Sequence, residues 1–194
     1  MGQRWTKKKL EDLALEERGR IGVGAHDTLD LERLADEYGV PVYASSELEV
    51  NGCSPEALDY FANEGAGNWS AALVPAGTGC FIVENSSHSP QRRRSNVAHE
   101  MAHLFLEHDF STVLFTDGGC RSLTAAMKAQ EEQALTLSAE LLIPKTAAIK
   151  AAIANWSDAE VAGHFDVSIE FARMRMNPSG ARTIAKRFLA KRQW

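Results

Sequence analysis

Residues 98–103 read AHEMAH, which places two histidines four positions apart with a glutamate directly after the first. On a helix this spacing puts His99 and His103 one turn apart on the same face, so both imidazoles can reach one metal ion. Glu100 then lies beside the ion, where a carboxylate can take a proton from an activated water and pass it to a leaving amine. The pattern predicts a catalytic centre with one Zn²⁺ per chain and Mn²⁺ as the second choice of metal.

A catalytic zinc centre needs a third protein ligand and an open position for water. A ligand farther along the same segment is disfavoured, because Leu106 stands where such a segment would need a glycine. A second helix is predicted from about residue 123 to residue 143, and within it residues 131–144 offer two adjacent carboxylates, Glu131 and Glu132. Glu131 shares one helical face with Ala134, Leu135, Ser138, Leu141 and Leu142. A charge on such a face needs a partner, but Glu132 also lies near apolar positions, so periodicity leaves both glutamates open.

The rest of the sequence predicts a small sheet among several helices. Helices are expected near residues 6–18, 30–38, 54–61, 89–107 and 123–143, and the last 50 residues look all-helical. Strand-like runs occupy residues 40–43, 48–50, 69–74 and 80–83. The expected fold class is α+β, with about three strands in an antiparallel or mixed sheet packed against the histidine-bearing helix. The run at 80–83 would pair with an extended substrate peptide if its edge were free, and is otherwise an internal strand.

The composition excludes several classes of protein. The 194 residues include 21 Lys and Arg against 26 Asp and Glu, and the net charge of −5 argues against nucleic-acid binding over the whole surface. The three cysteines form no CxxC pair, which predicts free thiols in a reducing compartment. The basic N-terminal stretch lacks the apolar core of a signal peptide, and no apolar run approaches a membrane span. We therefore expect a cytoplasmic protein without a membrane partner.

In these features the chain resembles the ImmA/IrrE family of zinc metallo-endopeptidases. The family shows an arginine-rich approach to an AHExxH helix, which residues 92–103 match. It also shows a second helix that carries a glutamate three residues before an alanine and ends in a leucine pair and a proline, which residues 131–144 match. The likeness extends over residues 29–177. It implies a zincin-like α+β fold.

The resemblance also implies roles for individual residues. His99, His103 and Glu131 would be the zinc ligands, and Glu100 would be the catalytic base. Family members are linked to phages and other mobile elements, toxin–antitoxin loci or stress responses. The implied activity is cleavage of a partner protein that is a helix-turn-helix transcriptional regulator, repressor or antitoxin. The alternative is a non-proteolytic regulator that uses the same fold to bind a repressor or DNA, but the complete set of catalytic residue types favours the enzyme.

Further residues near the motif are candidates for contacts with substrate. Asn96 and His108 could donate to the oxyanion of the reaction. Arg94 belongs to the run at 92–94, which could pair either with substrate carboxylates or with nearby glutamates.

The chain divides by pattern into three parts. Residues 1–24 form an N-terminal extension, residues 25–145 the metallopeptidase domain, and residues 146–194 a helical C-terminal segment. Residues 157–176 have a helix-turn-helix outline, but acidic residues outnumber the two arginines there, so we favour a packing role and do not expect direct DNA binding. The tail from residue 181 is a basic amphipathic helix.

Overall fold

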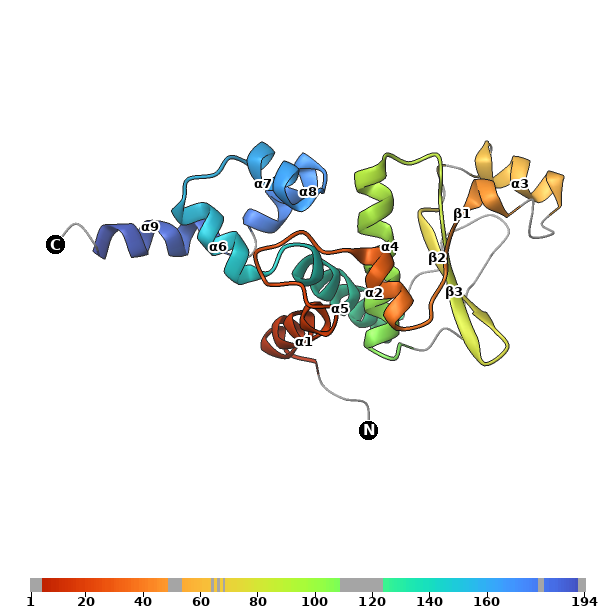
Figure 1. The fold of residues 1–194 in the computed structure, drawn as a ribbon, viewed down its shortest axis with the longest axis horizontal. Coiled ribbons are helices and arrows are strands. Elements are labelled where there is room, and N and C mark those ends of the chain that lie inside the picture. The colour runs from red at the N-terminus through yellow and green to blue at the C-terminus, as the bar shows by residue number, and fades with distance from the viewer. Residues whose placement is uncertain are drawn as a thin grey trace.

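The structure, a computed structural model, describes residues 5–48, 54–63, 65, 67, 69–108, 124–177 and 180–191. These residues form an α+β fold (Figure 1), which confirms the predicted fold class. The first helices are α1 (Lys7–Arg20), α2 (Leu31–Glu37), α3 (Pro55–Ala62), α4 (Pro90–Phe105) and α5 (Ala125–Leu142). The C-terminal helices are α6 (Lys145–Ile153), α7 (Asp158–Phe165), α8 (Ile169–Met176) and α9 (Ala181–Lys191).

The sheet has three strands in the order β1-β3-β2, namely β1 (Val42–Ala44), β3 (Gly79–Glu84) and β2 (Ala71–Ala76). β1 runs parallel to β3, and β2 runs antiparallel to it. Of the two options for residues 80–83, the structure shows the internal strand. Within the described residues β2 pairs with β3 alone, so β2 is an edge strand; its Pro75, which has no N–H to give to a further strand, suits that position. The predicted strand at 48–50 falls mostly outside the described residues.

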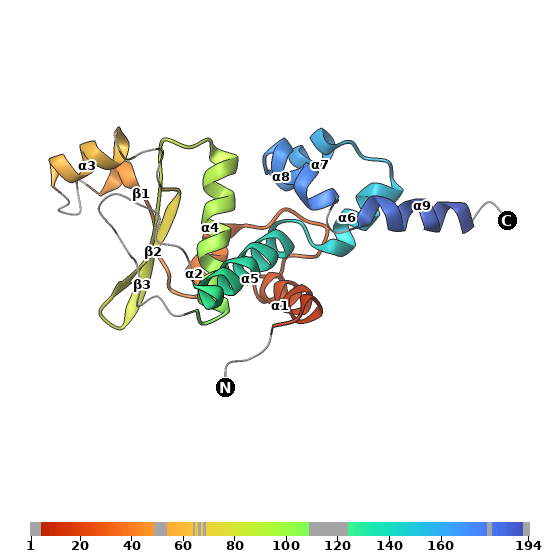
Figure 2. The same cartoon turned by 180° about the vertical axis from the view of Figure 1, so that it is seen from behind.

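Helix α4 lies along one face of the sheet, with α3 beyond the other face (Figures 1 and 2). Leu73 of β2 and Ile82 of β3 are buried in the same core as the apolar side of α4. That side consists of Val97, Ala98, Met101 and Ala102, all buried. Two alanines at the middle of this side leave room for a second helix, and α5 packs against α4 there.

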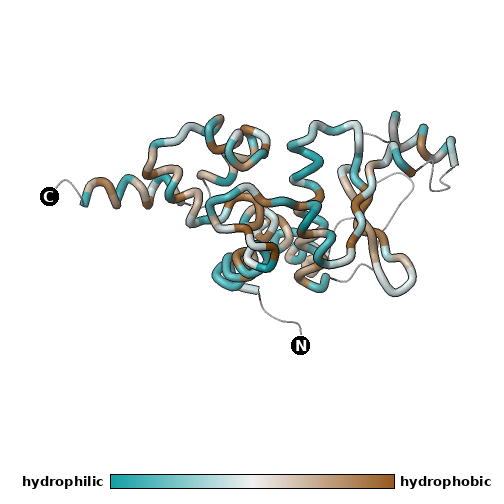
Figure 3. Tube along the Cα trace, viewed as in Figure 1, coloured by the Kyte–Doolittle hydropathy of each residue, from teal (hydrophilic) through white to brown (hydrophobic). Residues whose placement is uncertain are grey.

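Sequence signals define the ends of the two central helices. Ser89 accepts a hydrogen bond from the Arg92 N–H, and Pro90 fills the first position of α4, where a missing N–H costs nothing. Thr124 caps α5 in the same way, and Pro144 follows two residues after its last residue, Leu142. Hydrophilic residues dominate the N-terminal half of α4, whereas the strands are largely hydrophobic (Figure 3).

Helix α1 packs on α5 through a buried side that includes Arg18. The Arg18 guanidinium is fully buried and donates to the backbone carbonyls of Gly24, Asp27 and Leu141, the last at 2.5 Å. Burying a charge is costly unless it is hydrogen-bonded, and here three carbonyls supply that compensation. The guanidinium thereby joins α1, the turn that follows it, and the end of α5.

The C-terminal helices pack among themselves and against the end of α5. Arg175 of α8 is buried, donates to the Ile143 carbonyl at 2.8 Å and forms an ion pair with Glu140. Arg173 pairs with Asp158 of α7. Both arginines of the helix-turn-helix outline are therefore bonded within the protein, which supports the packing role. The proposed boundaries at residues 24/25 and 145/146 stay predictions.

None of the helices in the described part of the chain is long and apolar enough to cross a membrane.

Candidate metal centre

The two histidines of the motif lie on the side of α4 that faces α5. His99 and His103 are half-buried, one helical turn apart, and their Nε2 atoms are 3.1 Å from each other. The adjoining side of the helix carries the fully buried Ala98 and Ala102, which hold α4 in the core. The i, i+4 spacing and the burial of the alanine face together fix the direction in which both imidazoles point.

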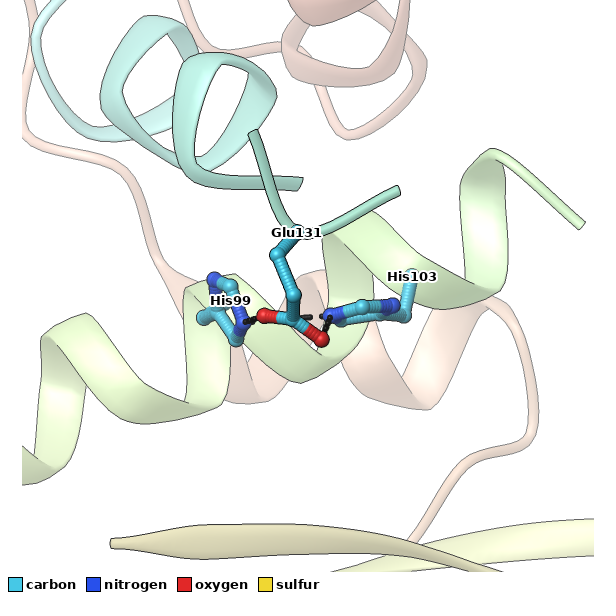
Figure 4. A group of neighbouring side chains, drawn as sticks. All are labelled: His99, His103 and Glu131. Atoms are coloured by element: carbon cyan, nitrogen blue, oxygen red, sulfur yellow. Dashed lines mark hydrogen bonds and ion pairs between the residues drawn. The ribbon is translucent and has the colours of Figure 1, made fainter. Parts of the chain in front are cut away.

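Glu131 of α5 completes the cluster. Its Oε2 is 3.2 Å from His99 Nε2, and its Oε1 is 3.5 Å from His103 Nε2. The carboxylate points between the two rings from the facing helix (Figure 4). The three residues form a group that could hold a metal ion.

The distances between these atoms fit a small tetrahedral ion. Zinc binds imidazole nitrogen and carboxylate oxygen at about 2.0–2.2 Å, so neighbouring ligand atoms of a tetrahedral centre are separated by about 3.3 Å. The two Nε2 atoms are 3.1 Å apart, and each lies 3.2 or 3.5 Å from one of the two Glu131 oxygens, all close to that value. Two neutral imidazoles and a carboxylate also aim lone pairs at one point, which is favourable only when a cation or protons occupy it. The residues present therefore fit zinc.

Glu132 takes a different position from Glu131. It is exposed on α5 and lies outside the group formed by the two histidines and Glu131. The buried face of α5 also differs from the predicted one. Leu135, which was expected on that face, is 56% exposed, whereas Leu137 is buried.

The environment keeps His103 neutral and available for a cation. Burial and, to a smaller extent, the neighbouring His99 lower the pKa of His103 to about 4, although Glu131 acts in the opposite direction. An imidazole with so low a pKa has a free lone pair at neutral pH, which a metal ion needs.

Glu100 lies beside the cluster and contacts the edge strand. Its Oε2 accepts a hydrogen bond from the Leu73 N–H of β2 at 3.1 Å. Burial raises the pKa of Glu100 to about 7, the Leu73 N–H opposes this, and the charge of Glu131 adds to it. A carboxylate with such a pKa can accept and return a proton near neutral pH. The sequence offered no signal for Leu73, because the contact uses a backbone N–H.

His108 lies next to His103 on the side away from Glu131. Its Nδ1 is 3.0 Å from His103 Nδ1, and its Nε2 is 3.2 Å from Gln133 Oε1 on α5. The predicted oxyanion contact is untested, but the observed partners of this ring are a metal-facing histidine and a glutamine. Gln133 had not been singled out from the sequence.

The other two predicted contact residues are bonded to the protein. Asn96 donates to the Ser70 carbonyl at 3.2 Å, just before β2 begins. Arg94 donates to the Leu29 carbonyl, away from the metal-facing cluster. Its neighbour Arg93 forms an ion pair with Glu84 of β3. For Arg93, the structure thus shows the glutamate partner of the two predicted alternatives.

Comparison with known proteins identifies the fold family. The family model described as the IrrE N-terminal-like domain, Peptidase_M78, matches residues 57–177, which is more than half of the chain. The match spans β2, β3, both central helices and all residues of the candidate centre. No curated protein matches the chain.

Proposed function

Because the chain belongs to the ImmA/IrrE family of metallopeptidases, we propose that it is a zinc-dependent endopeptidase that hydrolyses a peptide bond in a partner protein. The observation that carries the proposal is the convergence of His99, His103 and Glu131 beside the half-buried Glu100. A purely structural zinc site would have four protein ligands, whereas three ligands and an adjacent acid suit a catalytic site with an open position.

The three ligands would hold the ion between α4 and α5. When bound there, zinc lowers the pKa of a coordinated water and polarises the carbonyl of the peptide bond. His99 and His103 supply neutral nitrogen ligands from one helix, and Glu131 supplies a negative charge from the other. The two helices are held in place by the buried alanine face of α4, so the ligands are positioned before the metal arrives.

Glu100 is the proton carrier in this proposal. Its carboxylate accepts a proton from the attacking water and later delivers it to the nitrogen of the leaving amine. The Leu73 N–H holds one carboxylate oxygen, so the other oxygen is left for the water. The raised pKa matches the need to take up the proton and to give it away in the same reaction cycle.

The edge strand β2 is the proposed place for the substrate backbone. Leu73 N–H points to Glu100, whereas the N–H of Ile82, opposite it in β3, bonds to Pro41 on the β1 side. Leu73 therefore directs its backbone groups outward from the sheet, toward the catalytic glutamate. An extended peptide added to this edge would run past Glu100, and backbone pairing of this kind is a common mode of peptide recognition.

The substrate class follows from the family. We propose a helix-turn-helix transcriptional regulator, repressor or antitoxin as the partner, with a role in a stress response, a toxin–antitoxin system or a mobile element. A cytoplasmic location belongs to the same proposal, because such regulators act there and the cysteine pattern predicts free thiols.

Metal analysis of the purified protein and two variants tests the proposal. We expect about one zinc per chain in the unmodified protein and in Glu100→Gln, and none in His103→Ala. Neither variant should cleave candidate regulators, with the products followed by mass spectrometry. A metal-free protein, or unchanged cleavage by Glu100→Gln, would refute the proposal. If the unmodified protein binds a regulator without cleaving it, and Glu100→Gln binds that regulator equally well, the non-proteolytic alternative is favoured.

A further inference from the structure

We propose that His108 and Gln133 are positioning residues that fix the tautomer and ring orientation of His103 for metal binding. The inference rests on the proposed function, since it concerns a ligand of the proposed zinc. It assigns to His108 a role through another side chain, in place of a direct contact with the substrate.

The geometry forms a continuous chain of polar atoms from α4 to α5. His103 Nδ1 lies 3.0 Å from His108 Nδ1, and His108 Nε2 lies 3.2 Å from Gln133 Oε1. His108 is 7% exposed, so the protein shields this chain from competition with water.

One arrangement of protons satisfies both hydrogen bonds of this chain with both rings neutral. To bind a cation, His103 must present the lone pair of Nε2, so its proton lies on Nδ1. That N–H donates to His108 Nδ1, which must therefore carry a lone pair. The proton of His108 then lies on Nε2 and donates to the Gln133 oxygen, which only accepts. The Gln133 oxygen, as an acceptor, therefore fixes the proton of His108 on Nε2, and His108 in turn fixes the proton of His103 on Nδ1.

The two histidines of the motif differ in this respect. His99 Nδ1 is buried and has no hydrogen-bond partner among the described residues. His103 is therefore the ligand whose outer nitrogen is held by the protein. Residues that hold the second nitrogen of a ligating histidine are part of the design of metal sites, and their loss typically weakens metal binding by about 10–100-fold.

A matched pair of substitutions at residue 108 tests the inference. His108→Leu fills a similar volume without polar atoms, whereas His108→Asn keeps an acceptor near the position of Nδ1. The first readout is the tautomer of His103 in the metal-free protein, from long-range ¹H–¹⁵N spectra of the imidazoles. The second is zinc affinity, from competition with a chromophoric chelator. His164→Leu, at an exposed histidine of α7, is the control for loss of a histidine elsewhere.

We expect the Nδ1–H form of His103 in the unmodified protein and a mixture of tautomers in His108→Leu. Zinc affinity should fall by about 10–100-fold in His108→Leu, and less in His108→Asn. It should stay unchanged in His164→Leu. Gln133→Ala approaches the same chain from α5 and should weaken zinc binding in the same direction. If His108→Leu and Gln133→Ala bind zinc as tightly as the unmodified protein, the inference is wrong and the proposed function stands.

Failure of the proposed function gives a different result. The unmodified protein would then bind no zinc, and the tautomer spectra alone would decide. If the Nδ1–H form of His103 is present in the unmodified protein and is lost in His108→Leu, the positioning role is still supported. If the unmodified protein and His108→Leu give identical spectra, the positioning role is overturned.

Discussion

The polar side chains in the two halves of α4 differ in the partners that they bind. In the N-terminal half, Arg93 is paired with Glu84 of β3, and Arg94 donates to the Leu29 carbonyl. In the C-terminal half, His99 and His103 point at each other and at Glu131, three groups that all offer lone pairs. Both arginines of the first half bond to other parts of the protein, whereas the histidines of the second half converge with Glu131 on a place where a metal ion would fit.

This difference shows how one helix can serve both structure and chemistry. The arginine half ties α4 to the sheet and to the segment before α2, and so fixes the position of the helix. The histidine half can then keep an arrangement that is unfavourable without a ligand, because the rest of the helix holds it in place. Substitutions in the arginine half should therefore lower stability without changing the zinc content, whereas substitutions in the histidine half should remove the zinc.

The largest effect is expected from the third ligand. Glu131→Ala should abolish zinc binding and hydrolysis, because the histidines alone leave the ion with two protein ligands. The neighbouring Glu132→Ala is the matched control and should keep one zinc per chain, since Glu132 is exposed and outside the cluster. Metal analysis of both purified variants is the measurement. Loss of zinc in Glu132→Ala alone would mean that the helix register is wrong.

Metal removal should lower the stability of the protein by a measurable amount. A ligand present at a thousand times its Kd stabilises the folded state by about 4 kcal/mol. In a chain of this size each kcal/mol shifts the melting temperature by about 2–4 °C, so a chelator should lower it by roughly 8–16 °C. Differential scanning calorimetry with and without chelator measures this shift. His103→Ala should melt at the same temperature in both conditions, and a chelator effect of equal size in that variant would argue against the centre.

The arginine half should respond in stability and not in metal content. Arg93→Ala removes the partner of Glu84, a carboxylate that is largely buried, and should cost about 1–2 kcal/mol. Urea unfolding followed by circular dichroism gives the free energy of unfolding. Zinc content should be unchanged. If Arg93→Ala loses zinc but keeps its stability, the arginine half contributes to the metal site, and the proposed difference between the two halves of α4 is wrong.

The smallest effect is expected at Arg92. Its side chain is exposed, and its hydrogen bond to the Ser70 hydroxyl is long at 3.4 Å. Arg92→Ala should therefore change the free energy of unfolding by less than about 0.5 kcal/mol. The same urea titration serves as the measurement. Because the substitution type is the same as at Arg93, any large loss at Arg92 would mean that helix propensity or net charge, and not the ion pair, explains both results.

The sequence predicts local features of this fold well. The spacing of His99 and His103, the serine and proline before α4, and the proline after α5 all act within a few residues, so helix positions and two of the proposed ligands follow directly. The runs at 69–74 and 80–83, which become β2 and β3, were likewise visible as strand-like segments. The third ligand needed the family pattern, because periodicity alone did not separate Glu131 from Glu132.

Contacts between distant segments were not predictable in the same way. The hydrogen bond from Leu73 to Glu100 depends on how β2 lies against α4, and a backbone donor leaves no trace in residue types. The partner of His108 depends on how α4 crosses α5. Leu135 was placed on the buried face by its spacing, but the packing of α5 against α1 and α4 buries Leu137 instead. Which residues are buried or in contact depends here on how the helices and strands pack together, and the spacing of residues in one sequence does not reveal that packing.

The stretch matched by the family model is shorter than the unit that has to fold. A fragment limited to residues 57–177 would lack β1, so one edge of the central strand β3 would lie open. It would also lack Arg18, leaving the Leu141 carbonyl at the end of α5 without its guanidinium donor and the adjoining apolar side of α5 in water. A protein trimmed to the residues that the family model matches should therefore aggregate, because α5, the helix that carries Glu131, is supported by residues outside that stretch.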